Sequence, residues 1–271
     1  MLRSVKATYL LVPIISVFGF AATSLGQAIV PPFHNYQSSL GGVTTDYIWE
    51  NFSSENRPAG VGAGTGGMAS QWLAGLAPTQ GAAGPVFSGN PSNGTDYTDF
   101  VTTANGGGIY AFFTQTHFQI SSSTPVAGLQ TLTMQLYVAE GLTGAFGGST
   151  AILASDPVLS LTTSAGTFII NPTYISTSSH DSAVVNGSSS FLDMLNYQWD
   201  LSSVAGTPES YTLNWQTSYH SITFGEDVTE STAPNPSSVL AVPEPSTSVA
   251  ILGGFGVLAM FRRRWTAPQA I

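Results

Sequence analysis

The stretch Leu129-Gln-Thr-Leu-Thr-Met-Gln-Leu-Tyr-Val138 decides the fold that we expect. Apolar residues occupy every second position from Leu132 to Val138, and Thr, Gln and Tyr occupy the positions between, from Thr131 to Tyr137. A period of two places these two sets on opposite faces of a β-strand. The stretch therefore predicts a half-buried antiparallel strand whose apolar face lies in a hydrophobic core.

A second strand region, residues 211–228, carries the same signal with larger side chains. Its first half alternates apolar and polar residues, so we predict that Trp215 belongs to the core rather than to a ligand platform. The alternation changes phase before Ile222, which predicts a bulge or bend near residues 218–220. Upstream, residues 191–196 are the one place where a short helical turn competes with a strand.

Residues 108–120 also read as a strand, and shorter strand candidates, each bounded by Gly, Pro, Asp or Asn, occur at residues 151–154, 158–162 and 168–175. Strands at intervals of roughly 10 to 15 residues with Gly- and Pro-containing turns are typical of antiparallel β-sandwiches. We therefore predict an all-β fold, a jelly-roll-like antiparallel sandwich. Helices are expected only at the ends, as an N-terminal signal helix and a single C-terminal apolar helix.

The composition requires this fold to depend on hydrophobic packing. The chain has no cysteine, so disulfides cannot stabilise it, and 42% of its residues are apolar while only 8% are charged. Disordered chains show the opposite balance, with few apolar and many charged residues. We therefore expect a folded domain with a substantial core.

The charges are distributed unevenly along the chain. All 15 acidic residues lie between Asp46 and Glu244, whereas the basic residues cluster at the ends and leave Arg57 alone in the middle. Nucleic acids and anionic lipid surfaces need cationic partners, so this region is not expected to bind nucleic acid. Divalent cations and neutral sugars remain compatible with such a surface.

The N-terminus has the three parts of a secretory signal peptide. Arg3 and Lys6 precede an apolar run at residues 7–22, and the small residues Gly26 and Ala28 follow it. This order predicts export and cleavage after Ala28 by signal peptidase. The alternative is an uncleaved membrane anchor, although the apolar run is short for a membrane-spanning helix.

The C-terminus also has three parts in a fixed order. The first is a proline-fixed polar element of Val242, Pro243, Glu244 and Pro245. The second is an apolar segment, residues 247–261, that is expected to form a transmembrane helix. The third is a basic stop-transfer cluster of Arg262, Arg263 and Arg264. The apolar residues from Val249 to Phe261 would span about 20 Å as a helix, short of a bilayer core of about 30 Å. This length favours a temporary anchor over a permanent one.

These three parts resemble the PEP-CTERM sorting signal of Gram-negative bacteria. The resemblance covers only the tail, and it implies that an exosortase cleaves near the Pro-Glu-Pro element and that the protein reaches the cell surface or the extracellular matrix. An ordinary membrane anchor is one alternative. A lipid-attachment signal of the eukaryotic type is another, but such a signal normally ends in its apolar run and not in arginines.

The expected domain organisation follows from these segments. It comprises a signal peptide (residues 1–28), a β-rich exported domain (29–229), a Pro- and Ser-rich linker (230–241), the sorting signal (242–264) and a short remainder (265–271). The linker is expected to hold the sorting signal clear of the domain, because proline stiffens an extended chain.

No catalytic residue and no metal ligand is predicted from local motifs. The four histidines, at 34, 117, 180 and 220, lack the spacing of a zinc site. His180 and Asp181 are neighbours, but adjacent residues on a strand point to opposite faces, and a solvated loop is the interpretation we prefer there. The carboxylates considered for a paired acid and base are Glu226 with Asp227, Asp193 with Asp200, and Glu140.

Two stretches have compositions that some ligand-binding loops share, one rich in side-chain oxygens and one rich in glycine. Residues 90–99 are rich in Asn, Asp, Ser and Thr, which suits Ca²⁺, but ordinary turns use the same residues. Residues 60–67 are rich in glycine, but no lysine follows them as a phosphate-binding loop requires. Both stretches are interpreted as loops, and no cofactor is expected.

Three aromatic residues are the candidates for stacking on sugar rings: Trp72, Tyr197 and Trp199. We expect a non-catalytic cell-surface or extracellular-matrix protein that associates with exopolysaccharide. Its expected partners are signal peptidase, an exosortase-type peptidase, the membrane during transit, and exopolysaccharide. A polysaccharide-active hydrolase or lyase and a purely structural matrix component remain the alternatives.

Overall fold

A computed structural model of the 271-residue chain describes residues 31–50, 52, 75–81, 83–89, 100–102, 108–111, 115–140, 153–185, 188–219 and 221–240. These residues form two antiparallel sheets and one short 3₁₀ helix, η1 (Tyr36–Ser38). The prediction of an all-β fold is confirmed. The expected N-terminal and C-terminal helices lie outside the described residues, as do the loops at 60–67 and 90–99.

The larger of the two sheets, which we call the large sheet, has eight strands. Six follow the order β10-β11-β7-β13-β1-β2, and β5 pairs with both β13 and β4. Their bounds are β1 (Thr44–Glu50), β2 (Gln80–Gly81), β4 (Phe100–Thr102), β5 (Ile109–Ala111), β7 (Thr131–Ala139), β10 (Tyr174–Val185), β11 (Ser188–Asp200) and β13 (Ile222–Ser231). All of these pairings are antiparallel.

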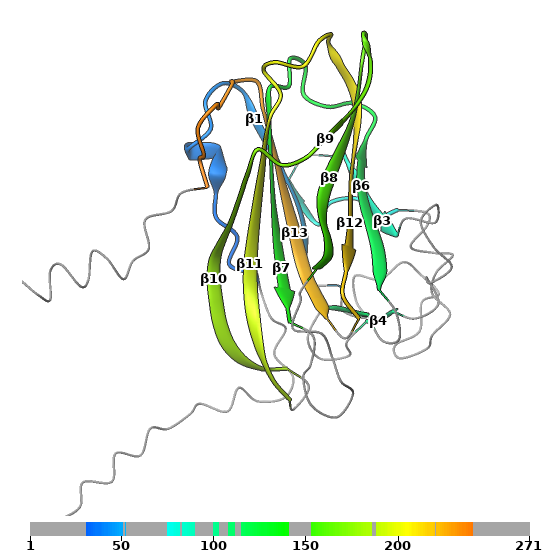
Figure 1. Ribbon diagram of the computed structural model, residues 1–271, viewed down its shortest axis with the longest axis vertical. Coiled ribbons are helices and arrows are strands. Elements are labelled where there is room, and N and C mark those ends of the chain that lie inside the picture. Colours follow the sequence, from blue (N-terminus) through cyan, green and yellow to red (C-terminus); the bar gives the residue numbers. More distant parts are fainter. Residues whose placement is uncertain are drawn as a thin grey trace, which may run out of the picture.

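The small sheet has five strands in the order β3-β6-β12-β8-β9, again with antiparallel pairing. Their bounds are β3 (Val86–Gly89), β6 (Thr116–Ser122), β8 (Leu153–Thr163), β9 (Gly166–Ile170) and β12 (Pro208–Thr217). Figure 1 shows the two sheets facing each other, with β10, β11, β7 and β13 on one side and β8, β12, β6 and β3 on the other. This arrangement is a β-sandwich.

The core lies between the sheets and is built by the residues that the alternation selects. The large sheet contributes the even-numbered side chains from Leu132 to Val138, and the small sheet contributes Leu213 and Trp215. Trp215 is 2% exposed, which confirms its predicted place in the core. Aromatic rings join the two sheets, as where Trp49 of β1 lies 6.5 Å from Phe87 of β3.

The structure decides between two pairs of local alternatives. Residues 191–196 do not form a helical turn, because they lie in the middle of β11, paired with β7 on one side and β10 on the other. The phase change near residues 218–220 reflects the predicted bend, between two strands, and not a bulge within one strand. Strand β12 ends at Thr217 in the small sheet and β13 begins at Ile222 in the large sheet, so the chain crosses the core there.

The outer face of the large sheet is covered by the two ends of the described chain, residues 31–40 and 232–240, which we call the covering segments. Figure 1 shows these blue and orange segments together beside this sheet. Tyr36, Leu40 and Leu240 form a small buried cluster between the segments. Close approach requires Gly225, because a Cβ atom there would lie 2.8 Å from a side-chain atom of Pro31.

Polar side chains of the sheet bind the covering segments. The Gln135 side chain accepts a hydrogen bond from the His34 backbone N–H (2.8 Å) and donates one to the His34 carbonyl (2.7 Å). Gln198 donates to the carbonyls of Asn235 (2.9 Å) and Ser237 (3.1 Å) and accepts from the N–H of Val239 (2.9 Å). Residues 230–240, expected to be a linker, therefore begin as the end of β13 and continue along the sheet.

Candidate functional site

Three side chains that bind metals in many proteins converge at one end of the inner face of the large sheet. His180 of β10 pairs across the strands with Asp193 of β11, and Asp193 pairs with Val138 of β7. Glu140 lies two residues after Val138, so it points to the same face. One ligand atom from each of Glu140, His180 and Asp193 lies within 4.8 Å of the other two.

The three residues differ in exposure, as a site open on one side would require. The Asp193 side chain is 3% exposed, whereas the His180 side chain is 54% exposed. The imidazole stacks on the Phe191 ring with 4.2 Å between centroids and 12° between planes. The backbone N–H of Glu140 donates to the Phe191 carbonyl at 2.9 Å. The cluster therefore has a buried carboxylate at its base and an oriented imidazole at its edge.

The electrostatics of this cluster follow from its contacts. His180 Nδ1 lies 2.6 Å from Asp193 Oδ1, and this hydrogen bond raises the pKa of His180. Burial, followed by the charge of Asp193, raises the pKa of Glu140. The second oxygen of Asp193, Oδ2, is buried and has no hydrogen-bond partner within the described ranges. His180 lies in β10 and not in the solvated loop that we preferred from the sequence. Its partner is Asp193 on the neighbouring strand and not the adjacent residue Asp181.

The other predicted carboxylate pairs do not come together. Glu226 faces the core and Asp227 faces the covering segments, because neighbours on β13 point to opposite sides. Glu226 is fully buried, neither of its oxygens has a partner among the described residues, and burial raises its pKa well above the ordinary value. Asp200 accepts a hydrogen bond from the N–H of Ser202 and lies seven residues along β11 from Asp193. Neither pair forms an acid–base site.

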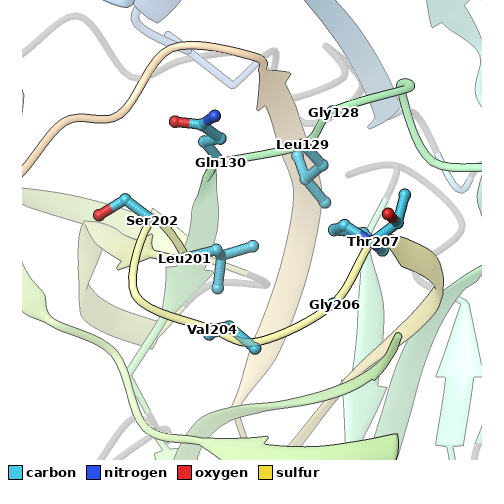
Figure 2. Close-up of a pocket in the computed structure, with 9 residues that line it drawn as sticks. Gly128, Leu129, Gln130, Leu201, Ser202, Val204, Gly206 and Thr207 are labelled. Atoms are coloured by element: carbon cyan, nitrogen blue, oxygen red, sulfur yellow. The ribbon is translucent and has the colours of Figure 1, made fainter. Parts of the chain in front are cut away.

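A hollow of about 280 Å³ lies between the β6–β7 and β11–β12 connections. Figure 2 shows the side chains of Leu129, Leu201 and Val204 pointing into the space between the two loops, with Gln130 and Ser202 at its edge. The lining has no ionisable side chain. Leu129 and Leu201 are buried in the core, so the accessible lining consists chiefly of amide, hydroxyl and backbone groups, which suit a neutral polar ligand.

The aromatic residues expected to stack on sugars are placed differently. Tyr197 and Trp199 are 1% and 0% exposed, and their polar atoms donate to Asp156 Oδ1 (3.2 Å) and to the Ile170 carbonyl (3.2 Å). They are core residues of β11, which corrects the prediction that they offer a stacking surface. Trp72 lies outside the described residues.

The comparisons with known proteins concern the tail. Residues 241–264 match the family model of the PEP-CTERM protein-sorting motif. This match confirms the predicted sorting signal, and Val242 to Pro245 and the three arginines lie within the matched residues. The chain is thus an exported, membrane-transiting protein that an exosortase processes. No curated protein and no solved structure matches the chain.

The described residues also include no helix long and apolar enough to cross a membrane. The predicted transmembrane helix at 247–261, the arginine cluster and the signal cleavage site at Gly26 and Ala28 lie outside them. The described part ends at Leu240, directly before the matched motif.

Proposed function

We propose that this protein is a non-catalytic component of the cell surface or extracellular matrix, with a jelly-roll-like sandwich that contacts exopolysaccharide. The observation that carries this proposal is the sorting motif at residues 241–264, which directs the chain out of the cell. The region between the two terminal signals has 14 acidic residues and one arginine, so it disfavours polyanionic partners and leaves neutral sugars as suitable ones.

The hollow in Figure 2 supports contact with a sugar. The side chains of Gln130, Ser202 and Thr207 supply amide and hydroxyl groups for sugar hydroxyls, and Val204 adds partly exposed aliphatic surface beside them. Glycoside hydrolysis needs two carboxyl groups beside the bond that is cleaved, and the lining of the hollow has none. The hollow is therefore better suited to binding than to cleavage.

Among the described residues, Glu140 and Asp193 are one pair of carboxylates that lies close enough together for the rival hydrolase. Asp193 is 2% exposed and already contacts His180, so a sugar could not reach it without a rearrangement. A purely structural matrix component would need no sugar contact at all.

The exported and processed protein, purified from a host with the sorting peptidase, tests the proposal on a glycan array and in an assay for released reducing sugar. We expect binding without sugar release, and at least tenfold weaker binding after Gln130→Ala with Ser202→Ala. The matched control, Gln37→Ala with Ser39→Ala, removes the same groups near η1 and should change binding by less than twofold. Sugar release would support the hydrolase, and absence of all glycan binding would support the structural role.

A further inference from the structure

We propose that Glu140, His180 and Asp193 form a binding site for one divalent metal ion of the zinc class. This goes beyond the proposed function, because the site lies on the inner face of the large sheet and shares no residue with the hollow in Figure 2. The three ligands come from the neighbouring strands β10 and β11 and from the residue that follows β7. Strand pairing therefore fixes their relative positions.

The first argument is charge. Two carboxylates within 4.8 Å repel each other, and a divalent cation between them would balance both. No lysine or arginine occurs among the described residues, so no cationic side chain in that part of the chain can do so. Protonated His180 balances only one of the two charges.

The second argument is the unsatisfied oxygen at the base of the cluster. Buried carboxylate oxygens normally accept hydrogen bonds, and an oxygen without a donor costs free energy unless another ligand approaches it. Asp193 Oδ2 is buried and lacks a partner in the described part of the protein, while Oδ1 contacts His180. A metal ion coordinated by Asp193 would remove this deficit.

The ligand types and spacing indicate the metal class. Zinc binds imidazole nitrogen and carboxylate oxygen at about 2.0–2.2 Å, which places tetrahedral ligand atoms about 3.4 Å apart. The ligand atoms of Glu140, His180 and Asp193 lie within 4.8 Å of one another, so small side-chain rotations would bring them to this separation. Calcium and magnesium prefer all-oxygen sites, so the imidazole favours a transition metal. Three protein ligands leave a fourth position open to water.

The orientation of His180 supports the same conclusion. Metal-binding imidazoles need a fixed ring plane, and stacking on Phe191 provides it. The strong contact between His180 Nδ1 and Asp193 Oδ1 shows that nitrogen and oxygen already face each other.

Zinc titration of the exported and processed protein, stripped with a chelator and followed by calorimetry and metal analysis, tests the proposal. We expect one zinc ion per chain, and at least tenfold weaker binding in each of Glu140→Gln, His180→Gln and Asp193→Asn. The matched control is Asp181→Asn, which removes an exposed acid on the opposite face of β10 and should change the affinity by less than twofold.

Circular dichroism of each variant separates loss of a ligand from loss of the fold, and Glu140→Gln is the decisive variant because Glu140 is partly exposed at a strand end. Sub-stoichiometric zinc binding by the wild type, or unchanged affinity in folded Glu140→Gln and His180→Gln, would overturn the site. Calcium binding as tight as zinc binding and independent of His180 would overturn the metal class.

Discussion

The outer faces of the two sheets differ in their exposure to solvent. In the small sheet, β6 and β12 alternate buried and partly exposed residues, so one face is in the core and the other is accessible to solvent. In the large sheet, every residue of β7 and β13 is buried, on both faces. The covering segments make this difference. A polar sheet face that would suit water instead binds the two ends of the described chain through its amide side chains.

This double burial has an electrostatic consequence. Strand β13 carries Glu226, Asp227 and Glu230, all of them buried. Glu230 accepts hydrogen bonds from the N–H of Val126 (2.6 Å) and the hydroxyl of Tyr211 (2.9 Å), but Glu226 has no partner among the described residues. The small sheet has no such buried acids among its described residues. Of these three acids only Asp227 faces the covering segments, so the cost of covering the large sheet depends on pH through Asp227, whereas Glu226 and Glu230 face the core.

The largest expected effect is a loss of stability as pH rises. Burial, followed by the charge of Asp46, raises the pKa of Asp227 to about 8. In the unfolded chain an aspartate has a pKa of about 3.9, so between about pH 4 and pH 8 the folded state holds a proton that the unfolded state has lost. Folding stability then falls by up to about 1.4 kcal/mol per pH unit across this window.

Urea denaturation in chelator at pH 5 and pH 7.5 measures this loss, and we expect the free energy of unfolding to fall by about 3 kcal/mol or more. The pKa of Glu226 is raised in the same direction. Asp227→Asn should remove much of the fall, because asparagine does not ionise. Glu209→Gln, an exposed acid on β12 of the small sheet, should leave the fall unchanged. A stability that is flat or rises over this range would contradict the buried state of Asp227.

Alternation in the sequence predicted the inner faces of both sheets well. It selected the core positions of β7 and β12, because a period of two assigns side chains to faces whatever covers them. It failed on the outer face of β7, where Thr131, Thr133 and Gln135 were expected to leave the strand half-buried and are instead 0%, 1% and 1% exposed. Polar residues identify the face away from the core, but they do not tell whether water or another segment covers it.

The next largest effect compares matched glutamines on the two outer faces. Gln135 of β7 makes three hydrogen bonds, two with the His34 backbone and one to Asp227 Oδ2 at 2.7 Å. Gln119 of β6 makes one, to Ser88 Oγ at 3.0 Å. Gln135→Ala leaves the His34 backbone N–H and carbonyl without these partners, so we expect the free energy of unfolding to fall by about 3 kcal/mol. For Gln119→Ala we expect a fall of less than about 1 kcal/mol. Equal costs in urea denaturation would show that the covering segment contributes nothing.

The candidate metal site lay beyond sequence reasoning for a different reason. Glu140, His180 and Asp193 are separated by 40 and 13 positions, and none belongs to a local motif. Only the pairing of β10, β11 and β7 brings them to one face, and strand pairing is not encoded in the period of a single strand. The sequence did identify Glu140 and Asp193 as carboxylates of interest, but it paired Asp193 with Asp200 and left Glu140 without a partner. The sorting motif of the tail, by contrast, was predictable from the sequence, because its signal is local and ordered along the chain.

The smallest effect compares two aliphatic residues outside the inter-sheet core. Leu240 is 2% exposed in the cluster with Tyr36 and Leu40, whereas Ile169 on β9 of the small sheet is 71% exposed. Leu240→Ala should cost about 2 kcal/mol, and Ile169→Ala should stay within about 0.5 kcal/mol. Hydrogen exchange should then speed up at residues 233–240 and stay unchanged in β9. Cleavage near Val242 to Pro245 would leave Leu240 in the processed protein, so the C-terminal covering segment should stay protected after processing. If exchange there is already fast in the wild type, the large sheet is covered only by the N-terminal segment.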